Sequence, residues 1–347
     1  MEDYSKTKIV VLLICILFTL NNLIFVGESI GGSKPLTAVR FASVPAIVEA
    51  PSHVAYQKKY FQQEGLNLSI EINPDGKTSL THLFEGKVDI AAVMGTPVVY
   101  SSFQRNDFYV IAKMEHAKIH SAIARKDSGI NINNDIKGKK VAVMFGTSGH
   151  FFLDSWLIFH NLKPSEIHLV NLNGPEAVDA IGRGDVDAMF YWFPFPDRAM
   201  REFDSKVFEL PSSHHVPGSW VIVVKKNYAH KNPEILKQFL RAITKADEFI
   251  RKEPEAAMRI HSDVSGVAVS ILSNKFKKMG FRLCLDQELI LDFEDQARWI
   301  ISYGYTTNKQ VPNYLNYIYP DALLSVKPAA VTLIHGAINE NSNTNYH

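Results

Sequence analysis

Apolar and polar positions follow the same order in two successive blocks of the chain. Between residues 39 and 112, short apolar runs of strand length are separated by segments whose apolar residues recur at helical spacing. The same order returns between residues 119 and 191. In each block a glycine-ended helix precedes a similar strand, Val88-Asp89-Ile90-Ala91 in one and Val186-Asp187-Ala188-Met189 in the other. This alternation predicts an α/β fold in two lobes, each a mostly parallel sheet flanked by helices.

The most informative stretch lies in the second block. Val141–Phe145 has the length and apolar content of a buried strand, and Phe151, Phe152 and Trp156 later follow at helical spacing. The turn between them reads Gly146-Thr147-Ser148-Gly149-His150. The first amides of a helix have no partner within it, so this turn suits an anion or a polar ligand head. The alternative is that Thr147 or Ser148 only caps the helix.

Other boundaries follow from local signals. Pro51-Ser52-His53 predicts a helix start with Ser52 as the cap, and Gly65 predicts its end. The β-run Trp220–Val224 predicts a return to the first block, and a helical C-terminal third follows from Pro233. The tail at 339–347 is rich in Asn and Ser, which predicts disorder.

The N-terminus has the pattern of an export signal. Lys6 and Lys8 precede the apolar run Ile9–Phe18, which predicts a signal peptide over residues 1–31. An uncleaved anchor is the alternative, because the apolar segment nearly reaches the roughly 20 residues needed to span a bilayer. In both cases we expect a periplasmic or extracytoplasmic protein.

Charge and cysteine content exclude several classes. The formal net charge is +1, and no basic stripe marks a nucleic-acid surface. Of the two cysteines, Cys15 lies in the apolar leader and Cys284 stands alone, so the exported chain cannot form an internal disulfide.

Catalytic and metal-binding patterns are also missing from the sequence. No paired carboxylates or Ser-His-Asp set can be placed in one cleft, and Gly146–Gly149 is not a P-loop because no Gly-Lys-Ser/Thr follows. His116 and His120, like His214 and His215, have spacings that do not converge in extended chain. We therefore expect no catalytic residue, no metal and no cofactor.

Four short motifs carry a family resemblance between about residues 39 and 257. They are Phe61-x-x-Glu64-Gly65-Leu66, Gly86-x-x-Asp89-Ile90-Ala91, Lys137-Gly138-Lys139-Lys140-Val141 and Gly184-Asp185-Val186-Asp187-Ala188. With these four motifs in this order, the chain resembles the extracytoplasmic substrate-binding proteins of ABC importers of the nitrate/sulfonate/taurine type. Those proteins share their fold with the thiamine-pyrimidine precursor family.

The resemblance implies a periplasmic-binding-protein fold of type 2 with a ligand cleft between its lobes. One lobe would combine residues 36–118 with 228–330, and the other would span 119–227. It implies a monomer that is not an enzyme, that captures a small anionic or heterocyclic organic ligand of the sulfonate, taurine, nitrate or pyrimidine class, and that delivers it to an ABC permease in the membrane. Lobe closure by hinge motion follows.

Ligands at such sheets bind beyond the carboxyl ends of the strands. Four turns qualify, and each also has a structural interpretation as a helix cap or as core packing. The ligand-binding residues expected from these turns are Ser43, Pro45, Met94, Gly95, Thr96, Gly146, Thr147, Ser148, Gly149, His150 and Trp192.

Two alternatives remain open. An enzyme of the same fold, a lyase or a pyrimidine-precursor synthase, would consume its ligand. The related synthases carry a cysteine cluster, whereas Cys284 is isolated here. A membrane-anchored ligand sensor would keep its leader and would have a partner other than a permease.

Overall fold

The structure is a computed structural model that describes residues 35–117, 119–131, 133–211 and 218–334. The predicted signal peptide or anchor at 1–31 and the predicted disordered tail at 339–347 lie outside these ranges. Within them, every helix is too short or too polar to cross a bilayer.

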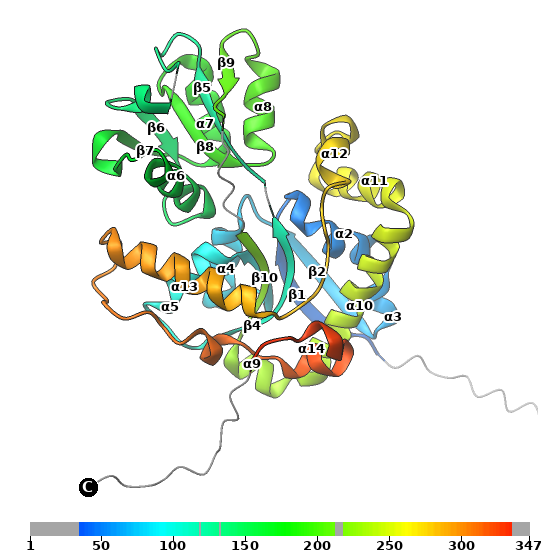
Figure 1. Cartoon of the computed structure of the whole chain (residues 1–347). Coiled ribbons are helices and arrows are strands. Elements are labelled where there is room, and N and C mark those ends of the chain that lie inside the picture. Colours follow the sequence, from blue (N-terminus) through cyan, green and yellow to red (C-terminus); the bar gives the residue numbers. More distant parts are fainter. Residues whose placement is uncertain (1–34, 118, 132, 212–217, 335–347) are drawn as a thin grey trace, which may run out of the picture. The chain divides into compact units, whose positions relative to one another are not determined.

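The first sheet has five strands in the order β2-β1-β3-β10-β4 (Figure 1). Strands β2, β1 and β3 pair in parallel, and β10 pairs antiparallel with both β3 and β4. One strand of the five is therefore reversed. The strands are β1 Thr37–Ser43, β2 Leu66–Ile72, β3 Ile90–Met94, β4 Phe108–Ala117 and β10 Gly218–Lys225.

The second sheet repeats this topology in the order β7-β6-β8-β5-β9. Here β5 is the reversed strand, antiparallel to β8 and β9. The reversed strands β5 and β10 follow the two points where the chain passes from one sheet to the other. The internal repeat and the mostly parallel direction are thus confirmed, with one antiparallel insertion in each sheet. The strands are β5 His120–Arg125, β6 Lys140–Val143, β7 His168–Asn171, β8 Ala188–Trp192 and β9 Val207–Glu209.

Helices cover both sheets (Figure 1). With the second sheet are η2 Asn133–Ile136, α6 Ser148–Phe159, η3 Pro164–Glu166, α7 Gly174–Arg183 and α8 Phe195–Glu202. The remaining helices are η1 Ile47–Glu49, α2 Ala50–Gln57, α3 Tyr60–Gln63, α4 Gly76–Glu85, α5 Gly95–Ser102, α9 Lys226–Lys231, α10 Pro233–Lys252, α11 Pro254–Ser265, α12 Val269–Phe276, α13 Gln287–Ser302, η4 Tyr314–Tyr317, α14 Asp321–Val326 and η5 Pro328–Ala330.

The C-terminal helices belong to the core of the first sheet. One apolar face of α10 is buried, and the Phe239 ring lies 5.2 Å from that of Phe41 on β1 and 5.0 Å from that of Phe61 on α3. Each buried aromatic side chain of this kind contributes roughly 1.5–3 kcal/mol. The helical C-terminal third therefore packs against elements from the beginning of the chain.

Three boundaries differ from the sequence prediction. Ser52 is not a cap, because the chain is already helical from η1 onward and Ser52 lies fully buried inside α2. The strand predicted at Val141–Phe145 ends at Val143, because the Phe145 amide leaves the ladder and donates to Asn171 Oδ1 at 2.9 Å. The range 119–227 was expected to form one lobe, but β10 pairs within the first sheet, so the chain rejoins that sheet by Gly218.

Candidate ligand-binding site

The turns after β1, β3, β6 and β8 line one cavity together with the start of α4. This first cavity has a volume of about 40 Å³. Because a cavity needs a volume of roughly 10–15 Å³ to hold one water molecule, this cavity has room for a polar group of a few atoms. Five predicted residues line it: Pro45, Met94, Thr147, Ser148 and Trp192. The structure thus brings together turns from all four predicted positions and from both sheets.

Thr147 and Ser148 have different roles in the turn before α6. The Thr147 hydroxyl donates to the Met144 carbonyl at 2.6 Å, so its hydrogen is already used within the turn. Thr147 stands at the N-cap position of α6, yet its side chain caps no amide. The first amides of α6 have no carbonyl partner in a preceding helical turn, so they are available to a ligand. Of the two hydroxyls, only that of Ser148 can direct its hydrogen into the first cavity.

His120 sets the direction of the Ser148 hydroxyl. Its Nε2 lies 2.9 Å from Ser148 Oγ, and its buried Nδ1 has no hydrogen-bond partner in the described part of the chain. Burial, with a smaller effect of the Lys275 charge, lowers the pKa of His120 to about 4, so the ring is neutral. An orphaned buried N–H is rarer than an orphaned acceptor, and we therefore assign the hydrogen to Nε2. The imidazole then donates to Ser148, whose own hydrogen turns to the cavity.

Replacing Ser148 and Thr147 separately distinguishes ligand contact from turn stability. Ser148→Ala is expected to weaken binding of an anionic ligand by about 1.5–3 kcal/mol, the contribution of a hydrogen bond to a charged group. The empty protein should also lose about 1–3 kcal/mol of stability, because the buried His120 N–H loses its acceptor, so ligand contact is measured by the affinity and not by the melting temperature. Thr147→Ala is expected to destabilise the empty protein by about 0.5–1.5 kcal/mol through loss of the bond to Met144. Calorimetric titration and thermal unfolding of both variants measure the two effects.

His120 supplies the control for this assignment. His120→Leu should weaken ligand binding in the natural sequence, but it should add nothing in the Ser148→Ala background, because the two residues act through one hydroxyl. Additive losses would contradict the assigned hydrogen-bond direction.

Six predicted residues lie elsewhere. Ser43 is fully buried and bonds Glu49 and His53, so its hydroxyl is used inside the first sheet's core. Gly95, Thr96 and Gly149 are buried in packing rather than lining the cavity. Gly146 and His150 line a second, neighbouring cavity. Gly149 has a clear packing reason, since a side chain there would meet the Phe190 carbonyl at 3.0 Å and the Trp192 ring at 3.4 Å.

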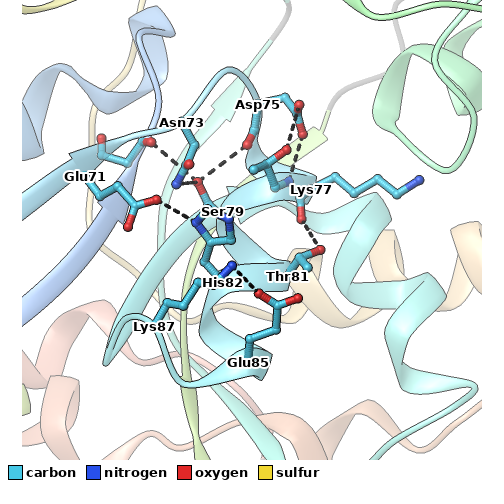
Figure 2. Close-up of polar contacts among 11 residues, drawn as sticks. Glu71, Asn73, Asp75, Lys77, Ser79, Thr81, His82, Glu85 and Lys87 are labelled. Carbon is cyan, nitrogen blue, oxygen red and sulfur yellow. Dashed lines mark hydrogen bonds and ion pairs between the residues drawn. The ribbon is translucent and has the colours of Figure 1, made fainter.

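Lys77 is a functional candidate that the sequence analysis missed. Asp75 caps α4 by accepting from the Thr78 amide at 2.9 Å, and Lys77 follows in the first turn. Figure 2 shows the Lys77 side chain extending away from the other labelled residues. Its Nζ donates to the Phe145 carbonyl at 3.1 Å, which links α4 to the turn after β6. The Asn73-Pro74-Asp75-Gly76 turn was visible in sequence, but nothing there showed that it faces Gly146.

Trp220 is a second candidate that the sequence analysis missed. Its indole lines the first cavity from β10, and its Nε1 donates to the buried carboxyl of Glu49. Burial raises the pKa of Glu49 to about 7, although hydrogen bonds from Ser43 and Trp220 act in the opposite direction. Behind Glu49 the polar chain continues through Ser43 to His53, whose Nδ1 lies 2.9 Å from Nδ1 of His261. This chain fixes one wall of the cavity.

Asp154 joins α6 to the C-terminal segment around α13. Its carboxyl is fully buried, and Oδ2 accepts from Trp299 Nε1 at 2.9 Å and from the Tyr305 hydroxyl at 2.8 Å. Burial raises the pKa of Asp154 to about 6, while the two hydrogen bonds lower it. The helix whose start lines the first cavity is therefore held by a buried polar contact nearly two turns further on.

Comparison with known proteins places this chain in a family. A family model described as NMT1/THI5 like matches residues 47–257, more than half of the 347 residues. The chain belongs to the NMT1/THI5-like family. This NMT1/THI5-like chain is 28% identical over 225 residues to the taurine-binding periplasmic protein of Escherichia coli (strain K12), an alignment that covers 63% of this chain and 68% of that protein.

The fold of the NMT1/THI5-like chain matches solved structures of binding proteins. The alkanesulfonate-binding protein SsuA from Xanthomonas axonopodis pv. citri, bound to MOPS, superposes with a TM-score of 0.72 at 17% sequence identity, covering 83% of this chain and 100% of that one. The predicted two-lobed α/β fold of periplasmic binding proteins is confirmed by this match. The family resemblance drawn from the four motifs is confirmed as well.

An enzyme also occurs among the relatives. The 4-amino-5-hydroxymethyl-2-methylpyrimidine phosphate synthase of Aspergillus parasiticus is 22% identical over 249 residues, 67% of this chain and 71% of that protein. In the NMT1/THI5-like chain, Cys284 is buried and its thiol donates to Asp286 Oδ2 at 3.2 Å. Burial raises its pKa to about 11, so it remains a thiol, and it does not line the first cavity. Cys284 is therefore unsuited to act as a nucleophile at this site.

Proposed function

We propose that the protein is an extracytoplasmic solute-binding protein that holds a small organic anion of the sulfonate class between its two sheets, without chemical turnover, and delivers it to an ABC importer. The observation that carries this proposal is the first cavity, where the start of α6 and the Ser148 hydroxyl face Lys77 and the start of α4. The start of α6, which no side chain caps, together with a directed hydroxyl and one ammonium group, suits an oxyanion.

The magnitudes agree with reversible capture. Hydrogen bonds to a charged group contribute about 1.5–3 kcal/mol each. Three or four of them, with apolar contact to Trp192 and Trp220, offset an association cost of about 4–15 kcal/mol. A micromolar complex needs a surplus of about 8 kcal/mol. Lys77 is exposed, so its ion pair with the ligand would remain hydrated and would not prevent release.

Lys77→Met tests the role of the ammonium group. In the empty protein the exposed Lys77 Nζ donates to the Phe145 carbonyl oxygen, so we expect little change in unfolding. Affinity for a sulfonate should fall by about 1–2 kcal/mol, and the remaining binding should depend less on ionic strength. The matched control is Lys87→Met, which removes an exposed ion pair with Glu85 near the other end of α4. Equal losses in both variants would show a general charge effect rather than a contact.

A thermal-shift panel tests the proposed ligand class. It should include taurine, alkanesulfonates, nitrate, bicarbonate, pyrimidines and riboflavin. A ligand present at a thousand times its dissociation constant stabilises by about 4 kcal/mol, which is readily detected. We expect the sulfonates to give the largest shifts. A response to pyrimidines alone would favour a relation to the pyrimidine-precursor synthases over the sulfonate-binding proteins. A response to nothing in the panel would count against a binding protein.

The taurine-binding and alkanesulfonate-binding relatives favour the periplasm and a permease partner for this chain. We further propose that the protein is a monomer, that its N-terminal segment directs its export, and that it has no nucleic-acid partner. An enzyme of the same fold is the second candidate, favoured by the synthase-named relative. It would consume the ligand that a binding protein returns unchanged.

A further inference from the structure

A second cavity of about 600 Å³ adjoins the first and shares Lys77 and Pro97 with it. It is much larger than the first, whose volume of about 40 Å³ suits only a head group. A ligand whose anionic group occupies the first cavity and continues past Lys77 would enter the second. The residues of the second cavity therefore decide what else the ligand carries.

Aromatic rings form much of the second cavity's wall. Tyr100 comes from α5, Phe145 from the turn after β6 and Tyr305 from the segment after α13. Phe145 is 37% exposed although it is a large apolar residue, and its ring lies 5.1 Å from that of His150. Rings presented from three different elements suit a flat ring better than a flexible alkyl chain, because aromatic pairs gain from stacked or edge-on contact.

His150 contributes a neutral ring to this wall. Its side chain is buried, and the ring lies 4.8 Å from that of Tyr305. Its Nδ1 accepts from the Gly146 amide at 3.5 Å, and its buried Nε2 lies 3.9 Å from Oδ2 of Asp154, a residue that lines neither cavity. Burial lowers the pKa of His150 to about 4, so the ring stays neutral. His150 therefore extends the ring-lined wall and adds no charge to it.

The geometry points to an aromatic sulfonate as the ligand class, with its sulfonate in the first cavity and its ring between Tyr100, Phe145 and Tyr305. This inference rests on the proposed function and narrows it. Taurine and short alkanesulfonates would occupy only the first cavity. They would leave the aromatic wall unused.

Calorimetric titration with three probes tests the inference: taurine, hexanesulfonate and benzenesulfonate. We expect benzenesulfonate to bind roughly tenfold more tightly than taurine through ring contact. Hexanesulfonate, whose flexible chain makes no ring contact, should gain less than benzenesulfonate. Phe145→Ala should remove most of the benzenesulfonate gain and leave taurine binding unchanged.

Phe159→Ala is the matched control, because Phe159 is 52% exposed at the other end of α6 and lines neither cavity. Equal affinities for taurine and benzenesulfonate, or a loss of both in Phe145→Ala, would overturn the aromatic assignment and leave the proposed function intact. Failure of all three sulfonates to bind would overturn both.

Discussion

Asp154→Ala is expected to destabilise the protein by about 2–4 kcal/mol. The substitution leaves the buried indole N–H of Trp299 and the Tyr305 hydroxyl without their shared acceptor, and an orphaned buried donor costs about 1–3 kcal/mol. Tyr305 is only half-buried, so water can replace part of its loss. Chemical denaturation at neutral pH measures the free energy of unfolding directly.

Asp154→Asn separates the hydrogen bonds from the charge. The amide keeps an acceptor oxygen for Trp299 and removes the cost of a buried ionised carboxyl, whose pKa is raised to about 6. We therefore expect it to remain within about 1 kcal/mol of the natural protein. If the alanine variant were as stable as the asparagine variant, Asp154 would not hold α6 to the C-terminal segment. Ligand affinity should also fall in the alanine variant, because α6 begins at the first cavity.

Glu49→Gln is expected to remove a loss of about 3 kcal/mol in the free energy of unfolding that the natural protein suffers as pH rises from 4.5 to 7. Folding raises the pKa of Glu49 from 4.5 to about 7, mainly by burial. Below pH 4.5 the carboxyl is protonated in both the folded and the unfolded state and costs nothing. As pH rises from 4.5 to 7, only the unfolded state loses the proton, so stability falls by about 1.4 kcal/mol per pH unit and then levels off.

The difference between the natural protein and Glu49→Gln isolates this group, because all other titrating groups are shared. Glutamine can accept from Trp220 and donate to Ser43, which can in turn donate to His53, so the polar chain behind the cavity is preserved. Unfolding free energies at steps between pH 4 and 8 should diverge in favour of the glutamine variant as pH rises. Parallel profiles would show that Glu49 is not buried as an acid.

The fold was predictable from sequence because its signals are local. Strands alternate with helices in both predicted blocks, and the run Val141–Phe145 forms β6, which ends at Val143. Capping residues such as Asn173, whose side chain accepts from the Glu176 amide, mark helix starts by chemistry that short segments contain. The one reversed strand in each sheet could not be read in this way, because strand direction depends on where the crossing chain inserts.

The site was predictable only in part. The turns that line the first cavity were predicted by their position after strands, and five of the eleven residues line it. Ser43 does not line the cavity, because a hydroxyl next to a strand end can also face the core, and here it donates to the Glu49 carboxyl. Lys77 and Trp220 line the first cavity, and His120 bonds Ser148 without lining it. These three residues were missed because each is placed by tertiary contacts with residues distant in sequence, which no spacing rule encodes.

Equilibrium dialysis of the purified protein against a mixture of taurine, alkanesulfonates and aromatic sulfonates tests the central claim most directly. The protein-bound compound would be released by denaturation and identified by mass spectrometry. We predict one sulfonate per chain, recovered with its mass unchanged, and loss of that retention in Ser148→Ala. Retention of no sulfonate, or recovery of a chemically altered product, would contradict the assignment of this chain as a binding protein.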